Sequence, residues 1–305
     1  MKVCFFGLGS IGQRHARNLL ITCKARGVDL MIDAFRQTQG PLPDDVAQVV
    51  NVVRDPQQLS EKYDAVFITN PTNQHYRTLL ENAGRSAYFF VEKPLFEQRQ
   101  RLPLPSESIY VACPLRYSGT IERLAPLIKQ ERVFSAVATC SSYLPDWRKA
   151  DYRQSYSAHK EMGGGVNIDL IHELDYLCYL FGKPMHVHLE MGKFSALEID
   201  SADTAVYQLA YPDKLALIYL DYFGVYAQRD VVLRTESTVI YADFLRNTLE
   251  IKRRDGDDEL IRWDENPNDK YLREMERFFD WTQGKAYNHN EGDLANEILA
   301  LAMGE

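Results

Sequence analysis

The chain has 305 residues, enough for two domains of ordinary size. Hydrophobic residues make up 45% of it and charged residues 26%, which excludes a disordered tail, a collagen-like repeat and a coiled coil. The formal net charge of -8 gives no overall field that would attract a phosphate backbone or an anionic bilayer, so neither nucleic acid nor a membrane is an expected partner.

The cysteines predict a reducing compartment. There are five, an odd number, widely spaced and without a Cys-x-x-Cys pair, as in a cytoplasmic protein with free thiols. The apolar run of residues 1–6 is too short for a signal peptide or a membrane span and favours a first strand. His186 and His188 have no third ligand in view, so no metal is assigned.

A glycine-rich turn follows the first predicted strand, Val3 to Phe6, and opens a helix that continues through Ala25. In this position Gly7 permits a tight turn, Gly9 lets the backbone approach a pyrophosphate and Gly12 lets helix and strand pack closely. The alternative is a glycine-rich turn without function. The residues expected to contact the dinucleotide here are Gly7, Gly9, Ser10, Ile11 and Gly12.

The second predicted strand, within residues 30–36, carries two candidates for the adenosine ribose. An acid there binds the 2′-hydroxyl of NAD, whereas an arginine favours the 2′-phosphate of NADP. Asp33 is flanked by strand residues, but Arg36 stands where the chain leaves the strand. The position of Arg36 favours NADP over NAD, with a solvated loop arginine as the alternative.

Two further buried strands are predicted at residues 63–69 and 87–91. Polar residues follow each strand, at the edge where open α/β sheets bind ligands. After the first come Asn70, Pro71 and His75, and after the second comes Glu92-Lys93-Pro94. We expect these residues to contribute to the cofactor site.

A last strand at residues 109–112 places the domain boundary near residues 114–117. This gives a Rossmann domain over residues 1–115 and a second domain over residues 116–305. Beyond residue 183 the chain alternates β-rich runs with hairpin turns at 211–214 and 254–257. The runs are residues 205–211, 215–222, 231–234 and 239–242.

Four ordered motifs resemble the glucose-fructose oxidoreductase, inositol dehydrogenase and MocA (Gfo/Idh/MocA) family of NAD(P)-dependent sugar dehydrogenases. They are Gly7-x-Gly9-x-x-Gly12-x-Arg14-His15, Asp64-x-Val66-x-Ile68-x-x-Pro71-x-x-x-His75, Glu92-Lys93-Pro94, and Gly163-Gly164-Gly165 leading to Asp169, His172 and Asp175. The resemblance implies an α/β Rossmann domain followed by an α+β domain. It further implies an open, mostly antiparallel sheet that flanks the active site and often makes homo-oligomer contacts.

The resemblance also implies catalytic residues for oxidation of an alcohol, which needs a base for the hydroxyl proton. Lys93 would orient the substrate and the nicotinamide and take part in the proton relay, with a surface ion pair to Glu92 as the alternative. His172 would be the base, since the unperturbed pKa of histidine, ~6.5, lies near working pH. A hydrogen-bonded core histidine is the alternative for His172.

Asp169 is the third catalytic candidate, and its spacing departs from the family. Asp169 and His172 are three residues apart rather than the more usual four, which still puts them on roughly one face of the predicted helix. The match can therefore be anchored on the glycines or on His172-x-x-Asp175, but not on both. Asp169 is either catalytic or a brace for the helix.

The segment of residues 143–160, rich in aromatic and arginine residues, precedes the three glycines. It has the composition to stack on a sugar ring and to hold a carboxylate or phosphate, and it resembles a branch of the family from surface-polysaccharide pathways. An activated or acidic sugar is therefore the expected substrate, with an ordinary surface loop as the alternative. The expected substrate contacts are Arg116, Trp147, Arg148, Tyr152 and His172.

Three functions fit these observations. The first is hydride transfer between NAD(P) and a carbohydrate hydroxyl or ketone. The second uses the cofactor only transiently, for epimerisation or elimination. The third is a nucleotide-binding regulator without turnover, since fold alone does not fix function; the presence of both Lys93 and His172 disfavours it.

Overall fold

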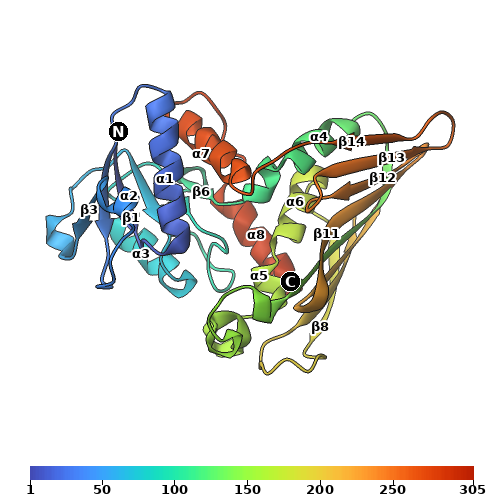
Figure 1. Cartoon of the computed structure of the whole chain (residues 1–305), viewed down its shortest axis with the longest axis horizontal. Coiled ribbons are helices and arrows are strands. Elements are labelled where there is room, and N and C mark those ends of the chain that lie inside the picture. The colour runs from blue at the N-terminus through green and yellow to red at the C-terminus, as the bar shows by residue number, and fades with distance from the viewer. The chain divides into compact units, whose positions relative to one another are not determined.

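The computed structural model describes all residues from Met1 to Glu305 and divides into two compact units. The first comprises residues 1–114 and 268–297, and the second comprises residues 115–267 and 298–305. Each carries one sheet (Figure 1). None of the helices has the length and apolarity that crossing a bilayer requires.

The sheet of the first unit has six parallel strands in the order β3-β2-β1-β4-β5-β6. This is the strand order of dinucleotide-binding folds, in which the order reverses beside β1 and opens a crevice at the carboxyl ends of the strands. The strands are β1 (Lys2–Phe6), β2 (Met31–Phe35), β3 (Val50–Val53), β4 (Ala65–Ile68), β5 (Phe89–Val91) and β6 (Ile109–Val111). β3 was not predicted, because Val50-Asn51-Val52-Val53 is short and half-exposed.

The helices of this unit are α1 (Ser10–Ala25), α2 (Asp44–Ala47), α3 (His75–Asn82), α7 (Asp269–Thr282) and most of α8 (Gly292–Ala302). α7 lies beside α1 (Figure 1). The segment of residues 268–297, which the sequence assigned to the second domain, thus groups with the first. The reason is aromatic packing: the Phe278 ring lies edge-on to the rings of Phe67, Phe90 and Tyr110, at 5.1–5.4 Å between centroids.

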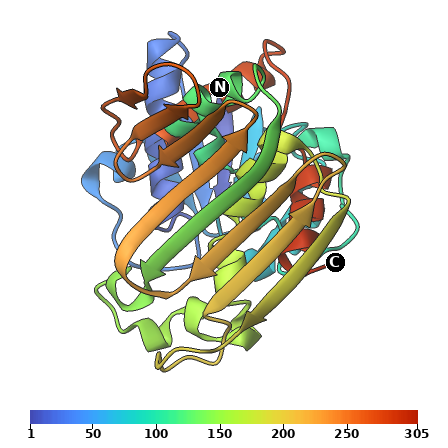
Figure 2. The same cartoon turned by 90° about the vertical axis from the view of Figure 1, so that its right-hand side faces the viewer.

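The second unit is built on an eight-stranded sheet in the order β14-β13-β12-β11-β7-β10-β9-β8 (Figure 2). Only the β10–β7 pair is parallel, which confirms a mostly antiparallel sheet. The strands are β7 (Val133–Tyr143), β8 (His186–Gly192), β9 (Thr204–Ala210), β10 (Leu215–Asp221), β11 (Phe223–Thr235), β12 (Thr238–Asp243), β13 (Thr248–Arg253) and β14 (Glu259–Arg262).

Both predicted hairpin turns join consecutive strands, β9 to β10 and β13 to β14. The long central strand β7 was not predicted. One face of the sheet is apolar and buried, with Tyr207, Ile218 and Leu233 along it. α4 (Gly119–Leu127), α5 (Val166–Asp169) and α6 (His172–Phe181) belong to the same unit.

The segment after the three glycines differs from the prediction of one continuous helix. α5 ends at Asp169, residues 170 and 171 form a turn, and α6 begins at His172. Asp169 and His172 therefore do not share a face of one helix. Asp169 is held by tyrosine hydroxyls at the last residue of α5.

Candidate active site

Packing within the chain accounts for two of the three glycines in the turn between β1 and α1. Gly7 has a φ of +89°, as a tight turn requires, and a Cβ there would lie 2.6 Å from the backbone N of Asn70. A Cβ on Gly12 would lie 2.6 Å from Oγ1 of Thr69. The turn is thus closed onto the segment that follows β4, which confirms the packing roles predicted for Gly7 and Gly12.

Gly9 is different, because nothing in the chain lies within 4 Å of a Cβ placed there. It is the N-cap of α1 and gives that helix no side-chain cap, and the first turn contains no acidic residue. The free N–H groups and the positive end of the helix dipole suit an anion. The open space at Gly9 fits the close approach of a pyrophosphate.

The end of β2 separates the two ribose candidates. Asp33 is buried, and its carboxylate accepts hydrogen bonds at 2.8 Å from Nδ2 of Asn51 and from the hydroxyl of Tyr63. The Asp33 carboxylate is therefore engaged in hydrogen bonds with side chains of its own unit. Arg36 lies beyond the strand and donates to Oγ1 of Thr38 at 2.9 Å and to the Gly40 carbonyl at 2.6 Å.

His75 joins the two loops that follow β4 and β5. Its ring is buried, with Nε2 at 2.9 Å from the Asn70 carbonyl and Nδ1 at 3.1 Å from the Leu95 carbonyl. Burial lowers the pKa of His75. His75 therefore supports the predicted cofactor loop from inside the unit.

A second buried histidine orients the Glu92-Lys93 pair after β5. The His15 side chain is fully buried between the rings of Phe90 and Tyr271, and its Nε2 lies 2.5 Å from Oε1 of Glu92. The other oxygen of Glu92 accepts the backbone N–H of Lys93 at 3.2 Å. Sequence reasoning noted His15 in the glycine motif but did not pair it with Glu92, because 77 residues separate them.

In the second unit, Asp169 is at the centre of a tyrosine pair that the sequence did not reveal. The hydroxyls of Tyr156 and Tyr222 each donate to one of its oxygens, both at 2.5 Å. Burial and the adjacent carboxylate raise the pKa of both tyrosines, which keeps both hydroxyls protonated as donors. Asp169 thereby ties the segment before the glycines to the start of β11.

His172 begins α6 and is partly exposed. One turn later, Asp175 forms a buried two-pronged ion pair with Arg116, at 2.8 and 2.6 Å. Arg116 is only 3% exposed, and its guanidinium lies 5.3 Å from the ring centre of Tyr179. The predicted substrate residue Arg116 is thus an internal anchor for the helix that carries His172.

The other three predicted substrate residues, Trp147, Arg148 and Tyr152, line one cavity of about 190 Å³. Trp147 is 37% exposed and packs edge-on against Tyr222, and its Nε1 donates to Oγ of Ser142 at 3.2 Å. The guanidinium of Arg148 lies 5.7 Å from the ring centre of Tyr156. This cavity therefore adjoins the two tyrosines that hold Asp169.

Comparison with known families assigns both units. Residues 1–102 match the model of the oxidoreductase family with an NAD-binding Rossmann fold, and residues 128–241 match the C-terminal domain of the same family. The chain belongs to the GFO/IDH/MocA family. It is accordingly an NAD(P)-dependent oxidoreductase, and its predicted fold class is confirmed.

Solved structures share the fold of this family member along its whole length, at low identity. UDP-N-acetylglucosamine 3-dehydrogenase from Acidithiobacillus ferrooxidans is 18% identical, with a TM-score of 0.75 over 99% of this chain and 95% of its own. An NAD-binding oxidoreductase from Klebsiella pneumoniae is 16% identical (TM-score 0.79; 100% and 95%). Levoglucosan dehydrogenase, in complex with NADH and levoglucosan, is 14% identical (TM-score 0.79; 100% and 95%). A search of the curated proteins gave no match.

Proposed function

We propose that this oxidoreductase transfers hydride between NADP(H) and a hydroxyl or ketone of an activated or acidic sugar. Two structures that share its fold bear the names of enzymes for a sugar nucleotide and for levoglucosan. The cavity lined by Trp147, Arg148 and Tyr152 has the matching chemistry: an aromatic face for a sugar ring and a guanidinium for a carboxylate or phosphate.

The observation that carries the proposal is the placement of Lys93. It follows β5 on the same edge of the parallel sheet as the Gly7–Gly12 turn, because the carboxyl ends of parallel strands meet at one edge. Its backbone is fixed by Glu92, which the buried His15 holds in turn. A cationic side chain at that edge suits a developing alkoxide.

We assign the proton of the substrate hydroxyl to His172 as general base and the stabilisation of the oxygen to Lys93. Asp169 and Arg116 are positioning residues in this scheme. Asp169 orients Tyr156 and Tyr222 beside the sugar cavity, and Arg116 anchors α6 through Asp175. Neither side chain is needed as a proton acceptor.

The cofactor would be held by the first unit. Gly9 and the first turn of α1, with Ser10 and Ile11, would receive the pyrophosphate, and Arg36 the 2′-phosphate. Asn70 and Pro71 would border it beside Lys93. Bound NADP supplies the hydride acceptor for the alcohol carbon.

Two titrations test the cofactor assignment. The fluorescence of NADPH and of NADH is followed as each binds to the wild type and to Arg36→Ala. We expect tighter binding of NADPH and loss of that preference, about tenfold or more, in the variant. Equal affinity of the wild type for both nucleotides would refute the role of Arg36, and lack of binding by protein first freed of endogenous nucleotide would refute the dinucleotide site.

A screen of nucleotide-linked and acidic sugars then tests the reaction. Turnover should fall by about 10² to 10⁴ in Lys93→Ala and His172→Ala, while His172→Ala keeps its affinity for NADPH. Product formation without net change in cofactor absorbance would indicate that the sugar is oxidised only transiently, as in an epimerase, and would contradict net dehydrogenation. Absence of turnover on every sugar would favour a regulator.

Two further proposals concern assembly and location. The outward face of the eight-stranded sheet exposes Val206, Leu217, Tyr219 and Tyr241 by 37–43% each, and we propose that it forms a homo-oligomer contact. Light scattering should give a dimer or larger species that Leu217→Lys dissociates.

All five cysteines are free and buried, which supports a location in the cytoplasm. Fractionation of the producing cells tests this location.

A further inference from the structure

Two arginines leave neighbouring strands of the first unit at the same level. In the parallel β2–β3 ladder Phe35 pairs with Val53, and the backbone N–H of Arg36 donates to the Val53 carbonyl at 3.1 Å. Arg36 and Arg54 are the first residues beyond these strands, at the edge of the sheet where parallel strands bind ligands. Sequence reasoning considered Arg36 alone, because β3 was not predicted.

The Arg36 guanidinium is held by its own loop, and one of its nitrogens is left over. Nε donates to Oγ1 of Thr38 at 2.9 Å, and Nη1 donates to the Gly40 carbonyl at 2.6 Å. Nη2 has no hydrogen-bond partner in the chain. The side chain is thus oriented before a ligand binds, which lowers the entropy that binding costs, and Nη2 remains able to donate.

Arg54 contacts the same loop from the neighbouring strand. Its Nη1 lies 3.4 Å from the carbonyl oxygen of Arg36 and 3.4 Å from that of Thr38. Both hydrogen bonds are long for an N–H donor. Nε and Nη2 of Arg54 have no partner in the chain. Arg54 is therefore placed on the loop by weak contacts, and two of its three nitrogens are available to a ligand.

The two guanidiniums share this loop without a balancing carboxylate, since neither forms an ion pair. The acids nearby in the sequence are engaged elsewhere or unpaired. Asp45 pairs with Arg17 at 2.5 Å, and Asp55 caps the helical turn that follows it. Asp44, at the start of α2, pairs with neither guanidinium. The loop therefore carries an uncompensated positive charge, in a chain whose net charge is -8.

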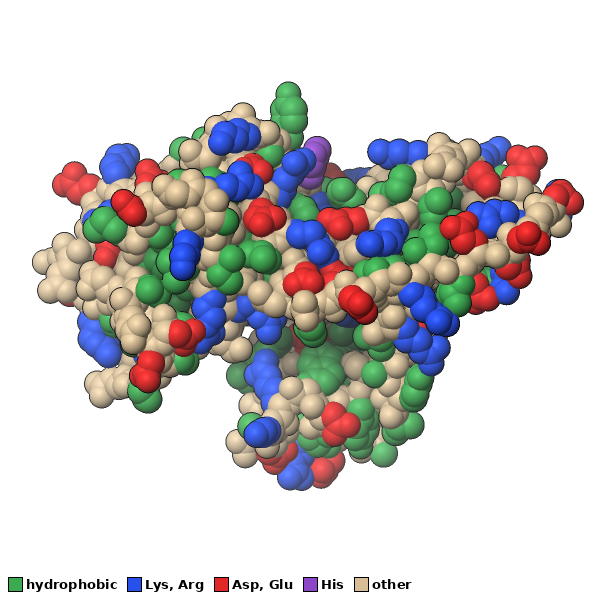
Figure 3. Space-filling view, turned by 45° about the horizontal axis from the view of Figure 1, so that its top comes forward, with side chains coloured by type: hydrophobic (Ala, Val, Ile, Leu, Met, Phe, Trp, Pro, Cys, Tyr) green, Lys and Arg blue, Asp and Glu red, His purple; other side chains and the backbone are tan.

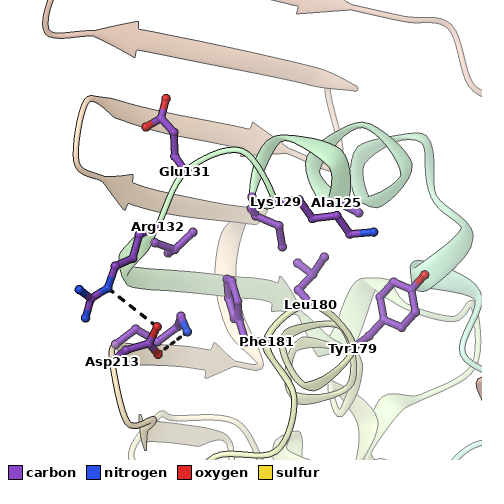
Figure 4. A pocket seen from close by; sticks show the side chains of 11 residues that line it. Ala125, Lys129, Glu131, Arg132, Tyr179, Leu180, Phe181 and Asp213 are labelled. Atoms are coloured by element: carbon purple, nitrogen blue, oxygen red, sulfur yellow. Dashed lines mark hydrogen bonds and ion pairs between the residues drawn. The ribbon is translucent and has the colours of Figure 1, made fainter.

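Cations elsewhere in the chain are often neutralised in place. Charges of both signs are interspersed on the face shown in Figure 3. In the hollow between the ends of α4 and α6 and the β9–β10 turn, Arg132 and Lys214 both lie against Asp213, at 4.0 and 2.5 Å (Figure 4). Two guanidiniums on one loop without an acid repel each other instead, and a bound anion would remove that repulsion.

We propose that Arg54 is a second specificity-determining residue for NADP, which binds the 2′-phosphate together with Arg36. This inference rests on the proposed function and extends its cofactor assignment to β3. Guanidinium groups match the geometry of a phosphate, and charge-assisted hydrogen bonds to it are strong. The 2′-hydroxyl of NAD would leave both cations without a counter-charge, so the pair also disfavours NAD.

The competing explanation is that Arg54 only braces the loop through the two carbonyls. A brace would act on both cofactors, because the adenosine ribose of NAD and that of NADP occupy the same place beyond β2. A ligand of the 2′-phosphate would act on NADP alone. The ratio of the two affinities therefore distinguishes the two roles, whereas a change common to both affinities does not.

Fluorescence titrations with NADPH and NADH test the inference. We expect Arg54→Ala to weaken NADPH about tenfold and to leave NADH unchanged, while Arg54→Lys, which keeps the charge, loses less. Lys62→Gln is the matched control, because Lys62 is an exposed cation that also donates to a carbonyl, before β4 at the opposite edge of the sheet. It should bind both nucleotides like the wild type. Thermal unfolding of each variant shows whether it is folded.

The same titrations at higher salt give a second measurement. Salt should weaken NADPH more than NADH in the wild type, and this difference should shrink in Arg54→Ala, since screening acts on the exposed charges that hold the phosphate. A loop brace would not change the difference. An unchanged difference in a folded Arg54→Ala would therefore contradict the role of Arg54.

The outcomes separate this inference from the cofactor assignment. If the wild type prefers NADPH and Arg54→Ala keeps that preference, or loses affinity for both nucleotides equally, Arg54 is not a ligand of the 2′-phosphate and the assignment of NADP stands. If the wild type binds both nucleotides equally, the assignment of NADP fails and the role of Arg54 fails with it. A loss in Lys62→Gln as large as that in Arg54→Ala would show a general effect of charge and overturn the specific role.

Discussion

The two units bring their candidate functional residues together in different ways. In the first, Gly7, Glu92 and Lys93 stand within two residues of a strand end, so the parallel sheet gathers them at one edge whatever the rest of the chain does. In the second, the partners of Asp169 and Asp175 are 13, 53 and 59 residues away. Local sequence motifs therefore identify the candidate residues of the first unit, whereas only the tertiary structure reveals the partners of Asp169 and Asp175 in the second.

The largest loss of stability is expected from a substitution at Asp175. Asp175→Asn removes the carboxylate charge that pairs with the buried guanidinium of Arg116, and the free energy of unfolding should fall by about 3–5 kcal/mol. Urea denaturation measures it. The double variant Arg116→Met/Asp175→Leu should recover most of the loss, since it removes both charges of the pair. A loss in Asp175→Asn below about 1 kcal/mol, the range of exposed pairs, would contradict the buried pair.

The tyrosine pair at Asp169 comes next. Tyr222→Phe removes one of the tyrosine donors from the carboxylate, and hydrogen bonds to charged groups contribute about 1.5–3 kcal/mol. The loss in the free energy of unfolding should approach that range for the buried Tyr222 and be smaller for Tyr156→Phe, whose residue is 39% exposed. No loss in either variant would show that Asp169 does not depend on this pair, and equal losses would show that the exposure of Tyr156 does not weaken its hydrogen bond.

These residues mark the limit of prediction from the sequence. The glycine turn, the strand ends and the family followed from order along the chain, because period, turn chemistry and motif spacing are local. Arg116 was expected on the substrate, since an exposed and a buried arginine look alike in a sequence. The tyrosine donors carry no motif, and β7 lies between segments that look like loop.

Gly12 and Gly9 of the turn should respond differently to substitution by alanine. Gly12→Ala places a Cβ 2.6 Å from Oγ1 of Thr69 and 2.9 Å from the Gly7 carbonyl, so the free energy of unfolding should fall by about 1–3 kcal/mol. Gly9→Ala meets no atom of the chain and should keep its stability while losing affinity for NADPH. The same change in both stability and affinity for both variants would mean that Gly9 is not kept open for a ligand.

The smallest effect expected is a pH dependence from His75, whose burial lowers its pKa. The folded chain then binds the proton of His75 more weakly than the unfolded chain, whose histidine has a pKa of ~6.5. Below that pH the unfolded state binds more protons, so stability is complete above it and is lost as the pH falls. The slope is at most about 1.4 kcal/mol per pH unit for one proton. Between neutral pH and pH of about 5, the free energy of unfolding of the wild type should therefore fall more steeply than that of His75→Gln. The control His188→Gln, at a residue with a largely exposed side chain, should retain the wild-type slope. Equal slopes in the wild type and His75→Gln would mean that the imidazole titrates as freely in the folded chain as in the unfolded one, and the two loops that it joins would then have to be held by other contacts.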